Sequence, residues 1–307
     1  MKIVAANDII PEKTAIALGI FDGVHSGHEF VFRRVNEYRK DGLMPAVFTF
    51  RTESLRFKRG EPFEYIYTNE QKLRLIEKNN IEYALCPDFD EMKELSGEEF
   101  VREILVKCMN VAVVVCGDNF RFGKGAACGS EELKALGEKY GFKVDVIRLK
   151  ENRISSKQFR EMLKAGTACG SGLFSYTLYA KVVKGNQIGR TLEFPTINQQ
   201  YASGQLVPKR GVYHTFTTVD GKTYNSVTNI GVKPTVEKNI RPLAETHILD
   251  FSGDLYGKRV EVGFLGLIRE EKKFGSLDEL KKQVFEDIEA VRKANAGVVC
   301  QGPSGKD

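Results

Sequence analysis

Two histidines three positions apart, His25 and His28, stand in the run Gly-Ile-Phe-Asp-Gly-Val-His-Ser-Gly-His at 19–28. The run follows an apolar stretch of strand length and precedes a helical pattern. A helix start offers unpaired N–H groups and partial positive charge, and the imidazole rings add donors. Gly27 lets the backbone approach a ligand closely. The run therefore predicts a polyphosphate site; the alternative is a surface or half-buried pair with no role.

Two further runs in the first half carry polar groups at a strand end or a helix start. In the run from Gly117 to Gly123, Phe122 can stack on a planar ring and Asn119 can hydrogen-bond to it, although a plain loop with core aromatics has the same pattern. The run Ile-Ser-Ser-Lys-Gln-Phe-Arg at 154–160 opens a helical pattern. Its two hydroxyls, the free N–H groups of the helix start and the arginine predict a phosphate clamp. The alternative is an ordinary capped helix with a surface arginine.

The second half contains the run Gly-Asn-Gln-Ile-Gly-Arg-Thr-Leu-Glu-Phe-Pro-Thr-Ile-Asn at 185–198. Thr196 and Asn198 are two positions apart, so an extended backbone places both oxygens on one side. Hard oxygen ligands suit Mg²⁺ when nucleotide phosphates complete its coordination shell. A polar loop with a proline turn is the alternative.

Strand-length apolar stretches alternate with helical patterns through the first half, at 14–20, 44–50, 83–86, 111–116 and 144–149. Capping boxes are predicted where Thr68 precedes Gln71 and where Ser96 precedes Glu99. This alternation predicts a parallel sheet covered on both faces, and ligands of such sheets bind beyond the carboxyl ends of the strands. The histidine run and the run at 117–123 both stand at such ends.

The composition changes near residue 165, where the small residues of 165–172 indicate a linker. Strands dominate afterwards, at 176–184, 212–219, 222–230, 245–251 and 259–264, and Asp220-Gly221 predicts a tight hairpin turn. A final helix is expected after a capping box of Ser276 and Glu279. Its apolar face is predicted to be Leu277, Leu280, Val284, Ile288 and Val291. This half reads as a β-barrel with one covering helix.

Length and composition indicate the number of domains, the kind of ligand and the cellular compartment. The 307 residues suggest two domains, predicted at 1–166 and 173–295, with a disordered tail at 296–307. A net charge of +5 suits small anionic ligands and is too weak for a nucleic-acid surface. Six cysteines without a Cys-x-x-Cys pair predict a reduced protein without a zinc site. The sequence shows no signal peptide and no long apolar run, so we expect a cytoplasmic protein that binds no membrane. We also expect a monomer or a weak oligomer.

Taken together, the three runs of the first half resemble, in order, the nucleotidyltransferase motifs of the FAD synthetase family. The resemblance implies a Rossmann-like domain that adenylylates FMN with ATP and releases pyrophosphate, with Mg²⁺ neutralising the polyphosphate. It implies catalytic roles for His25, His28 and Arg160. The residues it places at ATP and the flavin are Gly19, Phe21, Asp22, Gly23, Gly27, Asn119, Phe122, Ser155 and Ser156.

The run at 185–198 resembles the riboflavin kinase motif, in which the Thr and Asn of Pro-Thr-x-Asn hold the metal. Runs at 211–213, 229–235, 245–247 and 254–257 match the same family in order, so the similarity to bacterial bifunctional riboflavin kinase/FAD synthetases covers about 10–295. The resemblance implies a barrel that phosphorylates riboflavin with ATP, with Glu245 as general base. The implied substrate and metal contacts are Gly185, Gly189, Arg190, Pro195, Thr196 and Asn198.

One segment and two single positions depart from the family pattern. Arg-Thr-Glu-Ser at 51–54 replaces the usual Pro-His-Pro, Lys157 replaces a Ser or Thr, and Glu193 replaces a Gly. Lys157 can still bind phosphate as a point charge. Beside the bifunctional enzyme, two alternatives therefore stay open: a riboflavin kinase whose first domain adenylylates poorly or not at all, and a non-catalytic regulator that binds flavin or nucleotide.

Overall fold

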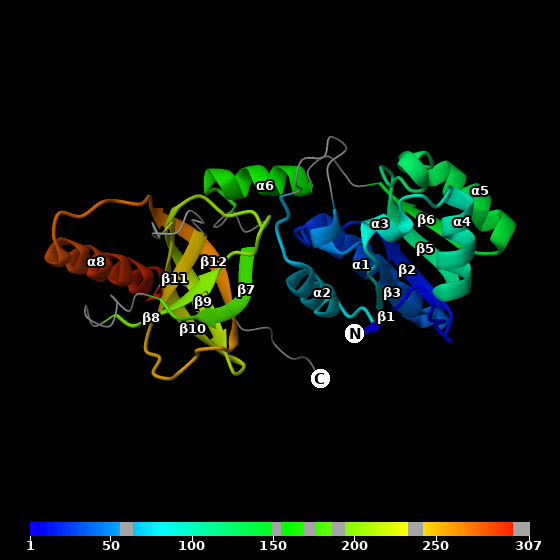
Figure 1. Ribbon diagram of the computed structural model, residues 1–307. Helices are drawn as coiled ribbons and strands as arrows, with labels where there is room; N and C mark the ends of the chain where they lie inside the picture. The colour runs from blue at the N-terminus through cyan, green and yellow to red at the C-terminus, as the bar shows by residue number, and fades with distance from the viewer. Residues whose placement is uncertain (56–63, 149–154, 169–175, 186–193, 233–241, 297–307) are drawn as a thin grey trace. The chain divides into compact units, whose positions relative to one another are not determined.

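The computed structural model describes residues 1–55, 64–148, 155–168, 176–185, 194–232 and 242–296 (Figure 1). The chain forms two compact units. The first comprises Met1–Phe159 and Gly204–Leu206, and the second comprises Arg160–Ser203 and Val207–Asp307. The first unit is an α/β structure and the second is built around a β-barrel. No helix of the described residues is long and apolar enough to cross a membrane.

The first unit is organised by a six-stranded parallel sheet in the order β1-β4-β3-β2-β5-β6. Its strands are β1 (Lys2–Val4), β2 (Thr14–Leu18), β3 (Met44–Phe48), β4 (Tyr83–Leu85), β5 (Val111–Gly117) and β6 (Lys143–Ile147). All five residues of β2 are at most 3% exposed, as expected for a central strand of a covered sheet. Each of the five predicted stretches overlaps one strand, to within a few residues at the ends, whereas the three residues of β1 were too few to predict.

Helices cover both faces of this sheet (Figure 1). They are α1 (Ser26–Glu37), η1 (Tyr38–Asp41), η2 (Thr52–Ser54), α2 (Asn69–Glu77), α3 (Phe89–Met92), α4 (Gly97–Glu99), the π-helix η3 (Phe100–Cys108), η4 (Lys124–Ala126) and α5 (Ser130–Tyr140). Because side chains alternate along a strand, β2 contributes to two cores. Ile16 packs in the core that contains Ile104 of η3, and Ala17 packs in the core that contains Phe32 of α1.

The order of the strands defines where a ligand can bind. After β2 the chain continues to β3 and β4 on one side, and it returns to β5 and β6 on the other side. The carboxyl ends of β2 and β5 therefore form the switch point of the sheet, which is the usual ligand position in open α/β folds. The histidine run follows β2 and the run at 117–123 follows β5.

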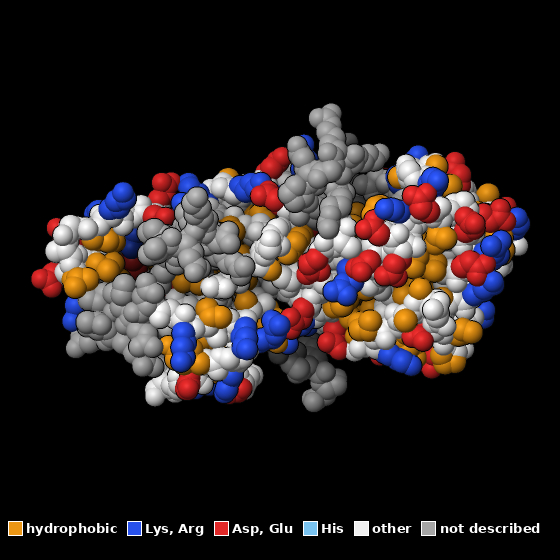
Figure 2. Space-filling view, viewed as in Figure 1, with side chains coloured by type: hydrophobic (Ala, Val, Ile, Leu, Met, Phe, Trp, Pro, Cys, Tyr) orange, Lys and Arg blue, Asp and Glu red, His pale blue; other side chains and the backbone are white. Residues whose placement is uncertain are grey.

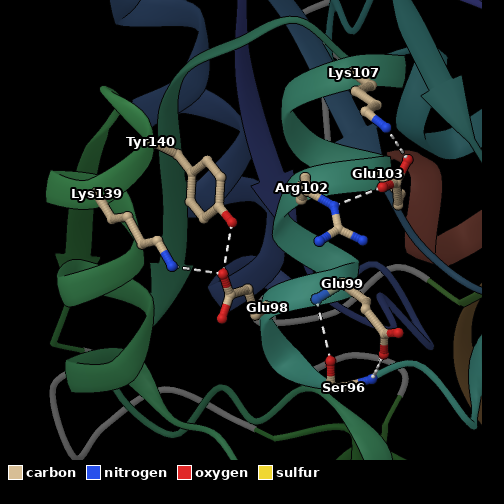
Figure 3. A network of polar contacts seen from close by, with 8 residues as sticks. All are labelled: Ser96, Glu98, Glu99, Arg102, Glu103, Lys107, Lys139 and Tyr140. Carbon is tan, nitrogen blue, oxygen red and sulfur yellow. Dashed lines mark hydrogen bonds and ion pairs between the residues drawn. The ribbon is translucent and has the colours of Figure 1, made fainter.

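The predicted capping boxes of the first unit lie at helix starts. The Thr68 hydroxyl accepts from the backbone N–H of Gln71 at 3.3 Å, and α2 begins one residue after Thr68. The Ser96 box is complete, since Ser96 Oγ accepts from the Glu99 N–H and the Glu99 carboxylate accepts from the Ser96 N–H (Figure 3). These bonds satisfy donors that the first turn of a helix otherwise leaves unpaired.

Surface polar contacts tie α4 to α5, and charged pairs lie along η3 (Figure 3). Glu98 accepts from Lys139 Nζ at 2.6 Å and from the Tyr140 hydroxyl at 2.7 Å, both on α5. These two donors lower the pKa of the Glu98 carboxyl. Acidic and basic side chains are interspersed over the first unit on the face shown in Figure 2. Such exposed pairs orient the helices and contribute little to stability individually.

The second unit contains a closed barrel with the strand order β10-β11-β8-β7-β12-β9. The strands are β7 (Tyr176–Val183), β8 (Thr196–Gln200), β9 (Gly211–Val219), β10 (Lys222–Val232), β11 (Pro242–Ile248) and β12 (Arg259–Arg269). The predicted hairpin is confirmed, because β9 and β10 pair from Val219 and Lys222 onward. Its turn residues Asp220 and Gly221 have φ of 48° and 79°, as a type I′ turn requires.

Buried hydroxyls line one face of three adjacent strands, β9, β10 and β11. Thr228 Oγ1 lies 2.8 Å from the Thr215 hydroxyl and 2.9 Å from the Thr246 hydroxyl, and all three residues are 0% exposed. A hydroxyl both donates and accepts, so a chain of them satisfies its own hydrogen bonds. Residue 245 lies on the opposite face of β11 from Thr246, because successive side chains of a strand alternate.

Among the described residues, the second unit also contains the helix α8 (Leu277–Ala296) and the later part of α6 (Ser156–Ala165), which begins in the first unit. The predicted apolar face of α8 is confirmed for Ile288 and Val291, which are buried, but Leu277 is 59% exposed. Apolar side chains accordingly gather on the visible surface of α8 (Figure 2). Leu277 stands in the first turn, and the packed face starts one turn later. The Ser276 oxygen accepts from the Glu279 N–H as predicted, while the Glu279 carboxylate bonds the Gly275 N–H.

An ion pair fastens α8 to the barrel. Arg269 of β12 donates from Nε and Nη2 to the two carboxylate oxygens of Asp287, at 2.9 and 2.8 Å. The Asp287 side chain is 4% exposed and that of Arg269 is 22% exposed. Planar, two-point contacts of this kind are the strongest form of the arginine–carboxylate pair.

We expect Asp287→Ala to lower the free energy of unfolding by about 3 kcal/mol, because it leaves the guanidinium with an uncompensated charge in a mostly buried site. Asp250→Ala is the matched control, since its contact with Arg292 is 3.4 Å long and both side chains are more than half exposed; it should cost about 1 kcal/mol or less. Urea unfolding followed by circular dichroism measures both. Equal losses in the two variants would contradict the prediction.

Candidate functional site

The loop after β2 adopts a backbone that few sequences tolerate. Phe21, Gly23 and Val24 have φ of 53°, 87° and 37°, and positive φ is unusual for a β-branched residue. The Asp22 carboxylate accepts from the Ile66 N–H at 2.9 Å. A Cβ at Gly23 would lie 2.7 Å from Ile66 Cδ1, so only glycine fits there. Strain that the surroundings hold in place is characteristic of functional loops.

The two histidines meet at the start of α1. His25 is the N-cap residue, and the two imidazole rings are stacked with centroids 3.6 Å apart. Phe21 packs edge-on against the ring of His28 at 5.1 Å. Both imidazoles therefore stand beside the unpaired N–H groups of the helix start, where a phosphate is favoured.

Ser156 joins this group from a position about 130 residues later in the chain. Its hydroxyl donates to the Asp22 carbonyl oxygen at 2.8 Å and lies 3.3 Å from His25 Nε2. The preceding residue, Ser155, forms a capping box with Gln158, whose side-chain oxygen accepts from the Ser155 N–H at 2.9 Å. The structure thus brings the histidine run and the start of α6 together, with Ser156 in contact and Ser155 as the cap.

His28 is held as a neutral ring. Burial, followed by the charges of His25 and Lys72, lowers the pKa of His28 well below its ordinary value of 6.5. Its Nδ1 is buried and has no hydrogen-bond partner among the residues that the structure describes. A buried polar atom without a partner is uncommon and marks a place where a ligand completes the hydrogen bonding.

We expect the lowered pKa of His28 to make the protein less stable in mild acid. Below about pH 6.5 the unfolded chain protonates this residue while the folded chain does not, so the unfolded state binds more protons and the free energy of unfolding falls as the pH drops. Urea unfolding at about pH 7.5 and about pH 5.5 measures the loss. His28→Gln should reduce the difference between the two pH values; an unchanged difference would contradict this origin.

The other predicted residues of the first half lie in different environments. Gly19 directly follows β2, with the Phe21 ring 2.9 Å from the position of a Cβ, and Gly27 is buried in the first turn of α1. Asn119 is exposed beyond β5. Phe122 is 7% exposed and packs on other aromatic rings of the core, 5.8 Å from both Phe100 and Phe120. Arg160 follows on α6, half-buried, and is grouped with the second unit.

The segment in place of the usual Pro-His-Pro forms a single 3₁₀ turn, η2. Arg51 Nε lies 3.3 Å from Asp88 Oδ1, and the Ser54 hydroxyl accepts from the Phe89 N–H at 2.8 Å. Thr52 is 1% exposed. The replacement residues therefore connect this turn to Asp88 and to the first residue of α3, Phe89.

In the second unit, strand pairing places three polar residues in one row. Glu245 of β11 is directly opposite Asn229 of β10 on one side and Asn198 of β8 on the other. Directly paired residues point to the same face of a sheet with Cβ atoms about 5 Å apart. Thr196 lies on that face of β8 as well, two residues from Asn198. The row therefore brings together the predicted base and both predicted metal ligands, and it adds Asn229, which the sequence analysis did not select.

The side chain of Asn198 fits a hard cation. It is 4% exposed, and its Oδ1 has no hydrogen-bond partner among the described residues. A Cβ at Gly185 would lie 2.5–2.6 Å from the Asn198 amide, so the glycine leaves space for it. In the described part of the chain, no three His, Cys, Asp or Glu side chains form a metal cluster. Oxygen ligands such as Thr196 and Asn198 suit Mg²⁺ when other ligands complete the shell.

His247 supports the turn that leads into β8. Its Nδ1 donates to the Pro195 carbonyl oxygen at 2.9 Å, and its ring meets Phe194 edge-on at 5.7 Å. His247 is also paired with Thr196 in the sheet. This histidine fixes the backbone from which Thr196 projects, and Pro195 itself is exposed. Gly189 and Arg190 lie outside the described residues.

Comparison with known proteins shows the same two-part organisation. The FAD synthetase family model matches residues 8–158 and the riboflavin kinase family model matches residues 173–295. The chain is 32% identical to the bifunctional riboflavin kinase/FMN adenylyltransferase of Haemophilus influenzae, over 91% of this chain and 93% of that protein. It is 34% identical to the protein of that name from Escherichia coli K12, over 90% and 91% of the two chains.

Among solved structures, a Streptococcus pneumoniae protein named as a macrolide-efflux protein superposes with a TM-score of 0.81. It is 28% identical, and the match covers 94% of this chain and 98% of that one. The fold is therefore common to the two chains over nearly their full length. With two family models matched in series and relatives above 30% identity over 90–91% of the chain, this protein belongs to the bifunctional riboflavin kinase/FMN adenylyltransferase family.

Proposed function

We propose that this chain makes two flavin cofactors in succession. The second unit phosphorylates riboflavin with ATP to give FMN, and the first unit adenylylates FMN with a second ATP to give FAD and pyrophosphate. The observation that carries the proposal is the row of Asn229, Glu245 and Asn198 in the barrel. It places a carboxylate beside the Asn198 amide oxygen, which has no hydrogen-bond partner among the residues that the structure describes, and a protein that only binds flavin needs no such carboxylate.

In the kinase step, Glu245 accepts the proton of the terminal ribityl hydroxyl as that oxygen attacks the γ-phosphorus of ATP. The new bond joins the ribityl oxygen to phosphorus, and the bond from phosphorus to the β-phosphate oxygen breaks, so ADP leaves. Thr196 and Asn198 would hold Mg²⁺, which neutralises the phosphate charge. Gly185 and Pro195 keep these ligands in place, and we assign Gly189 and Arg190 to the substrates.

In the adenylyl transfer, a phosphate oxygen of FMN attacks the α-phosphorus of ATP, and the bond to the β-phosphate breaks to release pyrophosphate. No group on the protein has to form a covalent bond. The imidazoles of His25 and His28, the N–H groups of α1 and the Ser156 hydroxyl supply donors for the charge that develops on the phosphates. We assign Asn119 to the base and flavin side of this site and Arg160 to the phosphates, while Phe122, which packs in the aromatic core, supports the loop that carries Asn119.

Incubating the protein with riboflavin, ATP and Mg²⁺ and separating the flavins by chromatography over time tests the proposal. FMN that appears first and is then converted to FAD supports both activities. FMN that accumulates without FAD would refute the assignment of the first unit and favour a kinase with an inactive first domain. Tight flavin binding without turnover of ATP would refute both assignments and favour a regulator.

A further inference from the structure

A buried lysine lies near the loop after β2 that carries the histidine run, and neither of the two proposed reactions uses it. Lys72 of α2 is 1% exposed, and its Nζ donates to the Thr49 hydroxyl at 3.3 Å and to the Phe50 carbonyl oxygen at 2.5 Å. The ammonium group has three N–H donors, so these two acceptors do not saturate it. Both acceptors follow the carboxyl end of β3.

The charge of Lys72 has no ion-pair partner in the part of the chain that the structure describes. Its two neighbours, a hydroxyl and a carbonyl, are neutral. Burial lowers the pKa of Lys72, although the more distant Cys86, Asp22 and Glu53 favour its charged form. Burying an ammonium without a carboxylate is costly, and proteins keep such groups where an anion binds or where a charge has a task.

Two connections link Lys72 to the histidine site. The Thr49 hydroxyl, which accepts from Lys72, donates to the Ile20 carbonyl oxygen at 2.8 Å and so supports the start of the loop after β2. The charge of Lys72 also reaches His28, where it disfavours protonation of the ring. The ammonium therefore stands at the same edge of the sheet as the two imidazoles and α1.

We propose that Lys72 is a positioning residue of the adenylyl transfer site, whose ammonium group favours the polyphosphate of ATP and the pyrophosphate product. It acts through Thr49 and the loop that Thr49 supports, and its field reaches the phosphates that the histidines bind. This inference rests on the proposed function of the first unit. A lysine that served only to pack the core would affect all ligands of the site alike, whereas a charge acts on charged ligands.

The test compares a charged and an uncharged inhibitor of FAD formation from FMN and ATP, a reaction that reports on the first site alone. In Lys72→Met we expect the inhibition constant of pyrophosphate to rise about tenfold or more, which is the loss of one charge-assisted interaction. The inhibition constant of adenosine should stay within about twofold, because adenosine carries no charge. Lys13→Met is the matched control. Lys13 is exposed and precedes β2 at the opposite end of the strand, so the same loss of charge should change neither constant.

A second pair of variants keeps the test decisive if Lys72→Met does not fold. Thr49→Val removes the hydroxyl that joins Lys72 to the loop and should raise the pyrophosphate constant, while Thr49→Ser keeps the hydroxyl and should not. Equal changes for pyrophosphate and adenosine in Lys72→Met, or no change in either, would overturn the inference. Wild-type protein that forms no FAD would instead refute the proposed function, so the two failures are distinguishable.

Discussion

Glu245→Gln is expected to slow FMN formation by about 10²- to 10⁴-fold, the usual contribution of a general base. Glutamine keeps the size of the side chain and its place in the row between Asn229 and Asn198, but it cannot accept the proton of the ribityl hydroxyl. Binding of riboflavin should change little. The measurement is the rate of FMN formation from riboflavin and ATP at saturating concentrations of both.

The chain supplies its own control for this variant. FAD formation from added FMN should be unchanged, because Glu245 belongs to the second unit. Glu261→Gln removes another carboxylate from a barrel strand, β12, outside the polar row, and should leave FMN formation within about twofold. A Glu245→Gln enzyme that phosphorylates riboflavin within a few-fold of the wild-type rate would show that the proton leaves by another route.

His28→Ala is expected to lower the rate of FAD formation by about 10²- to 10³-fold, the typical effect of removing one preorganised donor from a charged transition state. The loss removes the ring that stacks on His25 and packs against Phe21, so the remaining imidazole also loses its support. FAD formation from FMN and ATP measures the effect, and pyrophosphate release confirms it.

FMN formation from riboflavin should be unaffected by His28→Ala, since that reaction belongs to the barrel. The variant should therefore accumulate FMN when it is given riboflavin and ATP. Ser155→Ala is an instructive comparison, because the Ser155 hydroxyl is engaged in the capping box with Gln158 and its loss should affect mainly the start of α6. A His28→Ala protein that makes FAD within a few-fold of wild type would exclude His28 from the transfer step.

Local rules in the sequence predicted much of the fold. A capping box needs residues three positions apart, and a hairpin needs a turn such as Asp220-Gly221, so neighbours in the chain specify both. The alternation of strands and helices likewise predicted the parallel sheet and the edge where His25 and His28 stand. Leu277 shows the limit of this reasoning, because a helical period predicts a face but not how far along the helix the partner surface extends.

The contacts that build the two sites depend on distant parts of the chain. The resemblance places Ser156 and His25 in one site, but no local rule gives their direct contact, because they are 131 residues apart. The place of Asn229 beside Glu245 follows from strand register, which pattern alone does not give. Lys72 stands among polar residues at the start of α2, a composition typical of an exposed helix turn, and only the fold shows that its ammonium group is buried.

The register of β8 also limits where this chain can tolerate a change in length. Thr196 and Asn198 share one face of the strand only because a single residue separates them, and Asn198 reaches Glu245 only because the two are directly paired. One residue inserted or deleted between Thr196 and Asn198 would turn Asn198 to the opposite face of the strand. Because the barrel is closed, β8 has no free edge along which it could shift to restore the pairing with Glu245. This strand can therefore tolerate substitutions, whereas an insertion or deletion can be tolerated only in the segments on either side of it.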